Sequence, residues 1–129
     1  VTQRSISNWL SFFGVSDIGY TFTETQICGL PWKDRDLLWE RSPIAYVENV
    51  VTPILIIHSE KDIRCPIEQG EQFYTALKKL RKEVEMARFP ESNHELSRRG
   101  KPILRVHRLK QILRWFDAHL NKNTETKED

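Results

Sequence analysis

Three residues with chemically useful side chains follow directly after the most apolar run of the chain. The run "PILIIHS" (53–59) leads into Asp62, Arg64 and Cys65, and His94 lies 32 residues after Asp62. In nucleophilic catalysis an imidazole takes and returns a proton while a carboxylate holds the imidazole in place. Asp62 and His94 are therefore candidates for such a pair, provided that the fold brings them together.

The segments before Asp62 and His94 are predicted to be two strands of one parallel sheet. The run 53–59 holds three isoleucines and one leucine without polar alternation, which is typical of a strand covered on both faces. A second strand is predicted over "EVEMARF" (83–89), with alternate residues on opposite faces. The loops that follow parallel strands emerge at the same edge of the sheet, where ligands bind. The acid and the histidine are therefore expected to meet.

Helices are predicted before, between and after these strands. Ser42 is predicted to cap a short helix that begins at Pro43. The helix between the strands has its apolar stripe at Phe73, Leu77 and Leu80. A long helix from Pro102 has a predicted core stripe at Val106, Leu109, Leu113, Phe116 and Leu120. This order predicts an α/β fold with few parallel strands flanked by helices.

The composition narrows the class of partner. The 129 residues are 39% hydrophobic, which suffices for one core of ordinary size and so for one domain or part of one. The formal net charge of +2 comes from 20 basic and 18 acidic residues that are well mixed along the chain. Neither nucleic acid nor a membrane is therefore an expected partner, and a small molecule or peptide is. No apolar run approaches the roughly 20 residues of a membrane helix.

Cysteine and histidine usage predicts neither a disulfide framework nor a metal site. Cys28 and Cys65 are expected to be free thiols in a reducing compartment, which predicts a cytoplasmic location. The four histidines and the carboxylates show no metal-ligand spacing, and no glycine-rich phosphate loop occurs. No cofactor is therefore predicted.

The two ends of the sequence lead to expectations about its boundaries. The first residue is Val1 and the single methionine is Met86, so the chain is expected to be part of a longer protein. Residues 121–129 include no apolar side chain and are expected to form a disordered tail. The predicted domain is therefore 1–120.

Three segments resemble the prolyl oligopeptidase family of serine peptidases, most closely its acylaminoacyl-peptidase and dipeptidyl-peptidase branch. They are "AYVENVVTPILIIHSEKDIRCP" (45–66), "FPESNHELSRRGKP" (89–102) and, more weakly, "VTQRSISNWLSFFGVSDIGY" (1–20). The resemblance implies the C-terminal portion of an α/β-hydrolase domain, which in this family is joined to a β-propeller. It also implies a catalytic serine, aspartate and histidine in that chain order.

The resemblance gives several residues an implied role. By position in the motifs, Asp62 corresponds to the catalytic aspartate and His94 to the catalytic base. Arg64 corresponds to an arginine that binds a carbonyl oxygen of the substrate backbone. Tyr20 and Phe22 fall where the family builds the apolar pocket for the residue before the scissile bond.

One part of the family's machinery does not occur in the sequence. The nucleophilic serine of the family sits in a G-x-S-x-G turn, and residues 1–129 contain no such motif. The serine is expected to precede Val1, together with the oxyanion hole and the propeller. The expected function is hydrolysis of short peptides by the longer protein, with this chain inactive alone.

Other interpretations of the same residues remain open. Asp62 could be a turn residue, Arg64 a partner in a surface salt bridge, and Cys65 a packed thiol rather than a nucleophile. The chain could be a non-catalytic α/β interaction module, or part of a carboxylesterase, which shares the fold and the triad. A short sheet with an open edge is also expected to associate, most simply as a homodimer.

Overall fold

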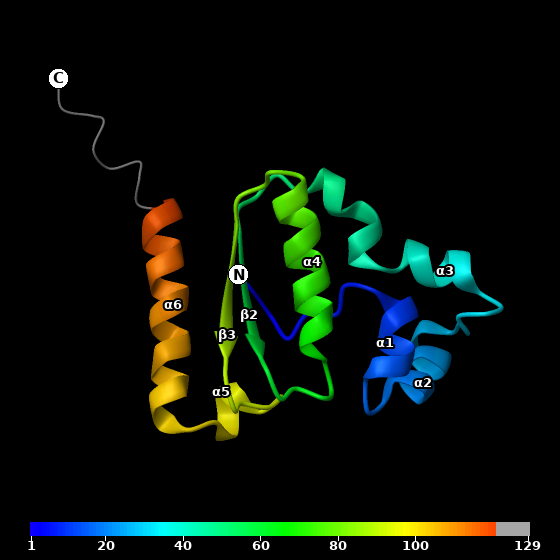
Figure 1. Cartoon of the computed structure of the whole chain (residues 1–129), viewed down its shortest axis with the longest axis horizontal. Helices are drawn as coiled ribbons and strands as arrows, with labels where there is room; N and C mark the ends of the chain where they lie inside the picture. The colour runs from blue at the N-terminus through cyan, green and yellow to red at the C-terminus, as the bar shows by residue number, and fades with distance from the viewer. Residues whose placement is uncertain (121–129) are drawn as a thin grey trace.

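Three strands and the helices between them are seen in a computed structural model that describes residues 1–120 (Figure 1). The tail predicted at 121–129 lies outside the described residues. The first half contains β1 (Thr2–Gln3), α1 (Trp9–Val15), α2 (Gly19–Phe22), the π-helical turn η1 (Thr23–Ile27), α3 (Arg35–Glu40) and the 3-10 helix η2 (Pro43–Asn49). The second half contains β2 (Ile54–Ser59), α4 (Ile67–Lys79), β3 (Val84–Phe89), α5 (Leu96–Arg99) and α6 (Pro102–Leu120).

The sheet has the strand order β1-β2-β3, and both neighbouring pairs run parallel. β1 is short, with Thr2 opposite Ile56, whereas β2 and β3 pair along their whole length, from Ile54 opposite Val84 to Ser59 opposite Phe89. The crossover from β2 to β3 is α4, as parallel pairing requires. The two predicted strands and their parallel pairing are confirmed.

Alternation along the strands divides the core between the two faces of the sheet. Ile56 and Val84 pack with Leu77 of α4, while Leu55 and Ile57 pack with Trp115 of α6. Figure 1 shows α4 and α6 on opposite sides of the strands. β2 is central in this sandwich, which explains why its first four residues, Ile54 to Ile57, are all apolar.

The predicted core stripe of α6 is wrong. Its members Val106, Leu109, Leu113, Phe116 and Leu120 are 41–67% exposed. The helix instead turns Trp115 into the core, with Leu104 and Ile112 partly buried beside it. α6 therefore has two apolar faces, and the spacing of its apolar residues does not reveal which face lies on the sheet.

Two smaller predictions also need correction. Leu80 is 38% exposed because it follows the last residue of α4 and leaves the apolar stripe there. Ser42 does precede η2, but its side chain makes no capping hydrogen bond. The Ser42 hydroxyl instead donates to the carbonyl of Leu38 (2.6 Å) and accepts from the amide of Trp9 (2.9 Å), which ties α3 to α1.

The helices α1 to α3 form a lobe beside the sheet (Figure 1). Trp9 stacks on Phe22 with a centroid distance of 5.8 Å and meets Phe12 edge to face at 5.2 Å. Phe12 and Leu38 are buried in this lobe. Among helices within residues 1–120, none combines the length and the apolar character that a membrane span requires.

Candidate active site

The loop after β2 holds Asp62 in a fixed orientation. Asp62 is 3% exposed, and its Oδ1 accepts hydrogen bonds from the backbone amides of Arg64 (3.0 Å) and Cys65 (2.8 Å). Two backbone donors on one oxygen restrict the rotation of the carboxylate. The other oxygen, Oδ2, remains directed toward the loop that follows β3.

His94 lies in the loop after β3 and contacts this carboxylate. Its Nδ1 lies 3.0 Å from Oδ2 and 3.2 Å from Oδ1 of Asp62, so the predicted approach of the two side chains is confirmed. An ionised carboxylate only accepts hydrogen bonds, so Nδ1 carries the proton and Nε2 is left as the basic nitrogen. The imidazole is 29% exposed, so that a second reactant can reach it, whereas the Asp62 side chain is fully buried.

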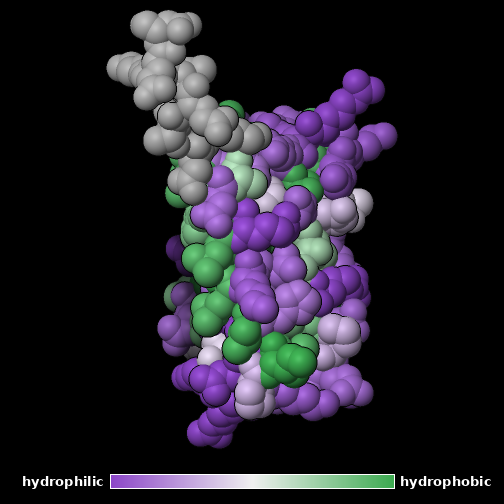
Figure 2. Space-filling view, turned by 90° about the vertical axis from the view of Figure 1, so that its left-hand side faces the viewer, coloured by the Kyte–Doolittle hydropathy of each residue, from purple (hydrophilic) through white to green (hydrophobic). Residues whose placement is uncertain are grey.

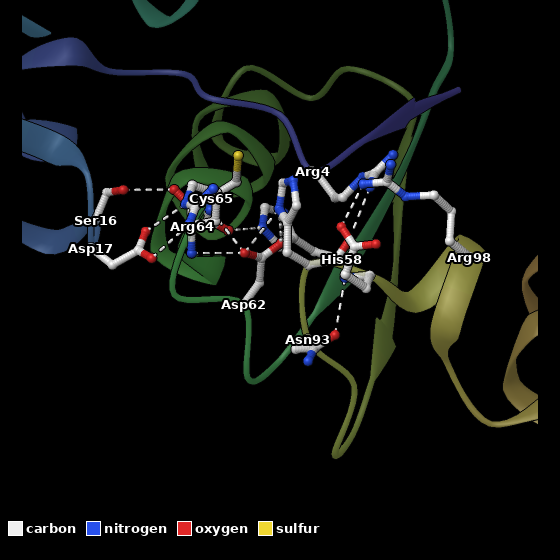
Figure 3. A network of polar contacts seen from close by, with 11 residues as sticks. Arg4, Ser16, Asp17, His58, Asp62, Arg64, Cys65, Asn93 and Arg98 are labelled. Atoms are coloured by element: carbon white, nitrogen blue, oxygen red, sulfur yellow. Dashed lines mark hydrogen bonds and ion pairs between the residues drawn. The ribbon is translucent and has the colours of Figure 1, made fainter. Parts of the chain in front are cut away.

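The backbone of His94 is held from the other end of the chain. The guanidinium of Arg4, just after β1, donates to the carbonyl of His94 at 2.9 Å. Figure 3 shows Arg4 reaching in from the segment next to β1 while Asp62 lies on the β2 loop. Three segments far apart in sequence therefore fix the pair.

Arg64 is held by Asp17 of the helical lobe. Its Nε donates to Asp17 Oδ1 (2.8 Å) and its Nη2 to Asp17 Oδ2 (3.0 Å), a bidentate ion pair visible in Figure 3. The Arg64 hydrogen bonds hold the pKa of Asp17 below its ordinary value, and Asp17 raises the pKa of Arg64. Arg64 therefore forms a surface salt bridge, which was one of the two interpretations of this residue. Its side chain is 46% exposed, and its implied contact with substrate stays a prediction.

A hollow of about 460 Å³ opens beside the imidazole. It combines acidic, basic and apolar side chains from the lobe and from both loops. Its lining consists of Asp17, Lys61, Ile63, Arg64, Glu91, Asn93, His94 and Glu95. Arg64 and His94 therefore share one cavity.

Tyr20 and Phe22 are not among the residues that line this hollow. Tyr20 is 61% exposed on the lobe, and Phe22 stacks on Trp9. Their implied place in a substrate pocket therefore has no support from the described residues and stays a prediction.

Sequence reasoning missed Asp17 and Arg4. Asp17 lies in a segment quoted only for its weaker resemblance, and Arg4 follows a two-residue strand whose pairing partner is more than 50 residues away. The backbone of Arg4 has a positive φ of 53°, an uncommon conformation, but the sequence around Arg4 does not indicate it. Both residues act across long sequence separations, where periodicity gives no information.

The neighbours of the pair are structural. His58 is buried, and its Nε2 donates to the carbonyl of Cys65 at 2.7 Å. Burial raises the pKa of the Cys65 thiol to about 11, so this thiol is neutral at pH 7 and unsuited to nucleophilic attack. Within residues 1–120 no three His, Cys, Asp or Glu side chains are grouped so that they could hold a metal ion.

Known proteins share much of the sequence of this chain. The model of the prolyl oligopeptidase family matches residues 1–123. The chain belongs to the prolyl oligopeptidase family. A Bacillus subtilis protein named as an uncharacterized peptidase, YuxL, is 58% identical over 120 residues, which are 93% of this chain and 18% of the relative. The acylamino-acid-releasing enzyme of Rattus norvegicus is 34% identical over 106 residues, 75% of this chain and 14% of that enzyme.

A solved structure of another family member shares the fold. The Pyrococcus horikoshii acylaminoacyl peptidase superposes with a TM-score of 0.88 at 38% identity, over 98% of this chain and 21% of that one. The fold is thus that of an α/β-hydrolase, with three parallel strands flanked by helices. The chain spans less than a quarter of the length of each of these family members.

Proposed function

We propose that this chain supplies the acid-base pair of a serine peptidase that acts on short, N-acylated peptides. The observation that carries the proposal is the contact of 3.0 Å between His94 Nδ1 and the buried carboxylate of Asp62, with the imidazole open to a hollow. The relatives named as an acylamino-acid-releasing enzyme and as an acylaminoacyl peptidase support the class of substrate. The nucleophilic serine is proposed to lie outside residues 1–129, in a longer protein of which this chain is part.

The proposed reaction is acyl transfer. His94 Nε2 takes the proton of the serine hydroxyl as the oxygen attacks the scissile carbonyl, and it returns that proton to the leaving amine. Asp62 keeps the imidazole in the tautomer with its proton on Nδ1 and stabilises the imidazolium that forms. Water then attacks the acyl-enzyme with His94 again as base, which releases the acylated amino acid and restores the serine.

The experiment uses a chimera in which this chain replaces the matching 120 residues of YuxL, to which it is 58% identical. The chimera is expected to react with a fluorophosphonate probe and to hydrolyse N-acetylated peptide anilides. The variants His94→Ala and Asp62→Asn should each lose about 10³-fold or more in kcat, because they remove the base or its tautomer. The control variant His107→Ala changes an exposed imidazole of α6 and should leave kcat unchanged.

The 129-residue chain by itself is expected not to react with the probe. Stoichiometric labelling of any serine in the isolated chain would contradict the proposed place of the nucleophile. A chimera that keeps full activity after His94→Ala would contradict the proposed role of the pair.

A further inference from the structure

Three acidic side chains line the hollow that opens beside His94, and each of them already has a cationic partner. The ion pairs are Asp17 with Arg64 at 2.8 Å, Glu91 with Lys101 at 3.0 Å, and Glu95 with Arg98. An ion pair offsets the field of its carboxylate, since the two opposite charges lie close together. The negative charge of the hollow is therefore balanced by side chains of this chain.

Lys61 also lines this hollow, but its ammonium forms no ion pair within residues 1–120. Its backbone is fixed, because its amide donates to the carbonyl of Ser92 at 2.9 Å. Lys101 and, less strongly, Lys61 lower the pKa of Glu91, so the field of Lys61 reaches that carboxylate. The ion pair of Glu91 is nevertheless made with Lys101. Lys61 is thus the cation of this hollow without a carboxylate partner in the described part of the chain.

The position of Lys61 distinguishes it from an ordinary solvated lysine. It directly precedes Asp62, so its backbone is part of the loop that orients His94. A volume of about 460 Å³ corresponds to a width on the order of 10 Å, close to the Debye length of about 8 Å at physiological ionic strength. A molecule that fills the hollow to reach the imidazole therefore lies within the field of the Lys61 ammonium.

The charges around Lys61 favour a single carboxylate over a more highly charged anion. An ammonium is a compact charge with three donors, which suits one carboxylate group. A phosphate carries a charge near −2 at pH 7 and would lie close to the three acidic side chains of the lining. Repulsion from these carboxylates grows with the charge of the ligand, so a monoanion is the better match.

We infer that Lys61 forms a subsite for a carboxylate of the substrate, so that peptides with a carboxylate near the scissile bond are preferred over their neutral counterparts. The inference rests on the proposed function, because it narrows the class of peptide that the same site accepts. The carboxylate has two possible sources, an acidic side chain and the free C-terminus of a short peptide. Both present the same chemistry to Lys61, and the experiment separates them.

The experiment measures kcat/KM in the YuxL chimera for two pairs of peptides that differ by one carboxylate. The first pair is acetyl-Ala-Glu-Ala amide and acetyl-Ala-Gln-Ala amide, and the second is acetyl-Ala-Gln-Ala with a free or an amidated C-terminus. In at least one pair the carboxylate form should have a kcat/KM about three- to fivefold higher, as expected for an exposed ion pair. The pair that responds identifies the source, and the ratio should fall as salt is added.

Variants of the chimera test whether Lys61 causes this preference. Lys61→Gln should reduce the ratio to about one, and Lys61→Arg should retain it, because the charge is kept. Glu91→Gln removes a negative charge from the lining and should raise the ratio. The control Lys79→Gln changes an exposed lysine at the far end of α4, which lines a different hollow, and should leave the ratio unchanged.

Binding provides a second measurement that does not need catalysis. In the chimera with His94→Ala, calorimetry should give a Kd about three- to fivefold lower for the preferred carboxylate peptide, and Lys61→Gln should abolish this difference. A chimera without activity that shows this pattern would contradict the proposed function and support the subsite. The inference is overturned if neither pair shows a preference, if the preference survives Lys61→Gln, or if none of the peptides binds.

Discussion

The two oxygens of the Asp62 carboxylate have separate tasks. Oδ1 is anchored by two backbone amides of its own loop, and Oδ2 is the nearer contact of His94. The loop in turn is tied to β2 by the hydrogen bond from His58 to the Cys65 carbonyl. The orientation of the imidazole is thus set by Asp62, and the loop that carries Asp62 is itself held by short hydrogen bonds at the carboxyl end of β2.

The buried imidazole of His58 should make stability depend on pH. Burial lowers the pKa of His58 below 6.5, so the folded chain keeps it neutral where the unfolded chain already binds a proton. Stability is therefore full above pH 6.5 and is lost as the pH falls below it, by up to about 1.4 kcal/mol per pH unit. Urea unfolding at pH 7.5 and 5.5 should show a steeper loss for the wild type than for His58→Asn. Equal slopes would show that His58 does not titrate differently on folding.

The two cysteines should differ sharply in reactivity. Cys28 is exposed, whereas Cys65 is buried with its pKa raised to about 11. At pH 7.5 iodoacetamide should add once to the native chain, at Cys28, and twice after denaturation. Peptide mapping by mass spectrometry identifies the site, and modification of both thiols at similar rates in the native chain would contradict the buried position of Cys65.

At the scale of elements, the junction between α1 and α2 depends on a glycine. A Cβ at Gly19 would lie 2.3 Å from the Phe12 carbonyl oxygen and 2.4 Å from that of Phe13, whereas a Cβ at Gly14 would meet nothing within 4 Å. Gly19→Ala should therefore cost about 2 to 3 kcal/mol of unfolding free energy, because backbone atoms must move. The matched control Gly14→Ala lies in α1 and should gain about 0.5 to 1 kcal/mol. Urea unfolding measures both, and equal effects would contradict the close packing of α2 on α1.

Elements with a strong periodic pattern were predictable, and the contacts between them were less so. The apolar run of β2 and the alternation of β3 predicted their pairing and hence the meeting of Asp62 with His94. The lobe and the clamp from Arg4 to His94 depend on packing between distant segments, for which local sequence has no signal. The stripe of α6 was found by its spacing, but spacing indicates only that a face is apolar and not what covers it.

At the scale of the whole molecule, the chain presents more apolar surface than its own fold covers. The sheet is covered by α4 and α6, yet α6 has an exposed apolar stripe, and β1 pairs with β2 alone within residues 1–120. This α6 stripe consists of Val106, Leu109, Leu113, Phe116 and Leu120, and Figure 2 shows a hydrophobic band along this helix. Among the residues that the structure describes, nothing covers this stripe, and it faces water.

The isolated 129-residue chain is expected to self-associate through the α6 stripe, most simply as a two-fold dimer. Two antiparallel copies of the α6 stripe would bury each other's apolar side chains, which is favourable because that area leaves water. Sedimentation equilibrium at micromolar concentration should give about twice the mass of one 15.3 kDa chain. Leu109→Glu and Leu113→Glu should restore the mass of a single chain, whereas Val51→Glu should not, because Val51 lies off the stripe. A wild-type mass of 15.3 kDa would show that the exposed stripe alone does not drive association.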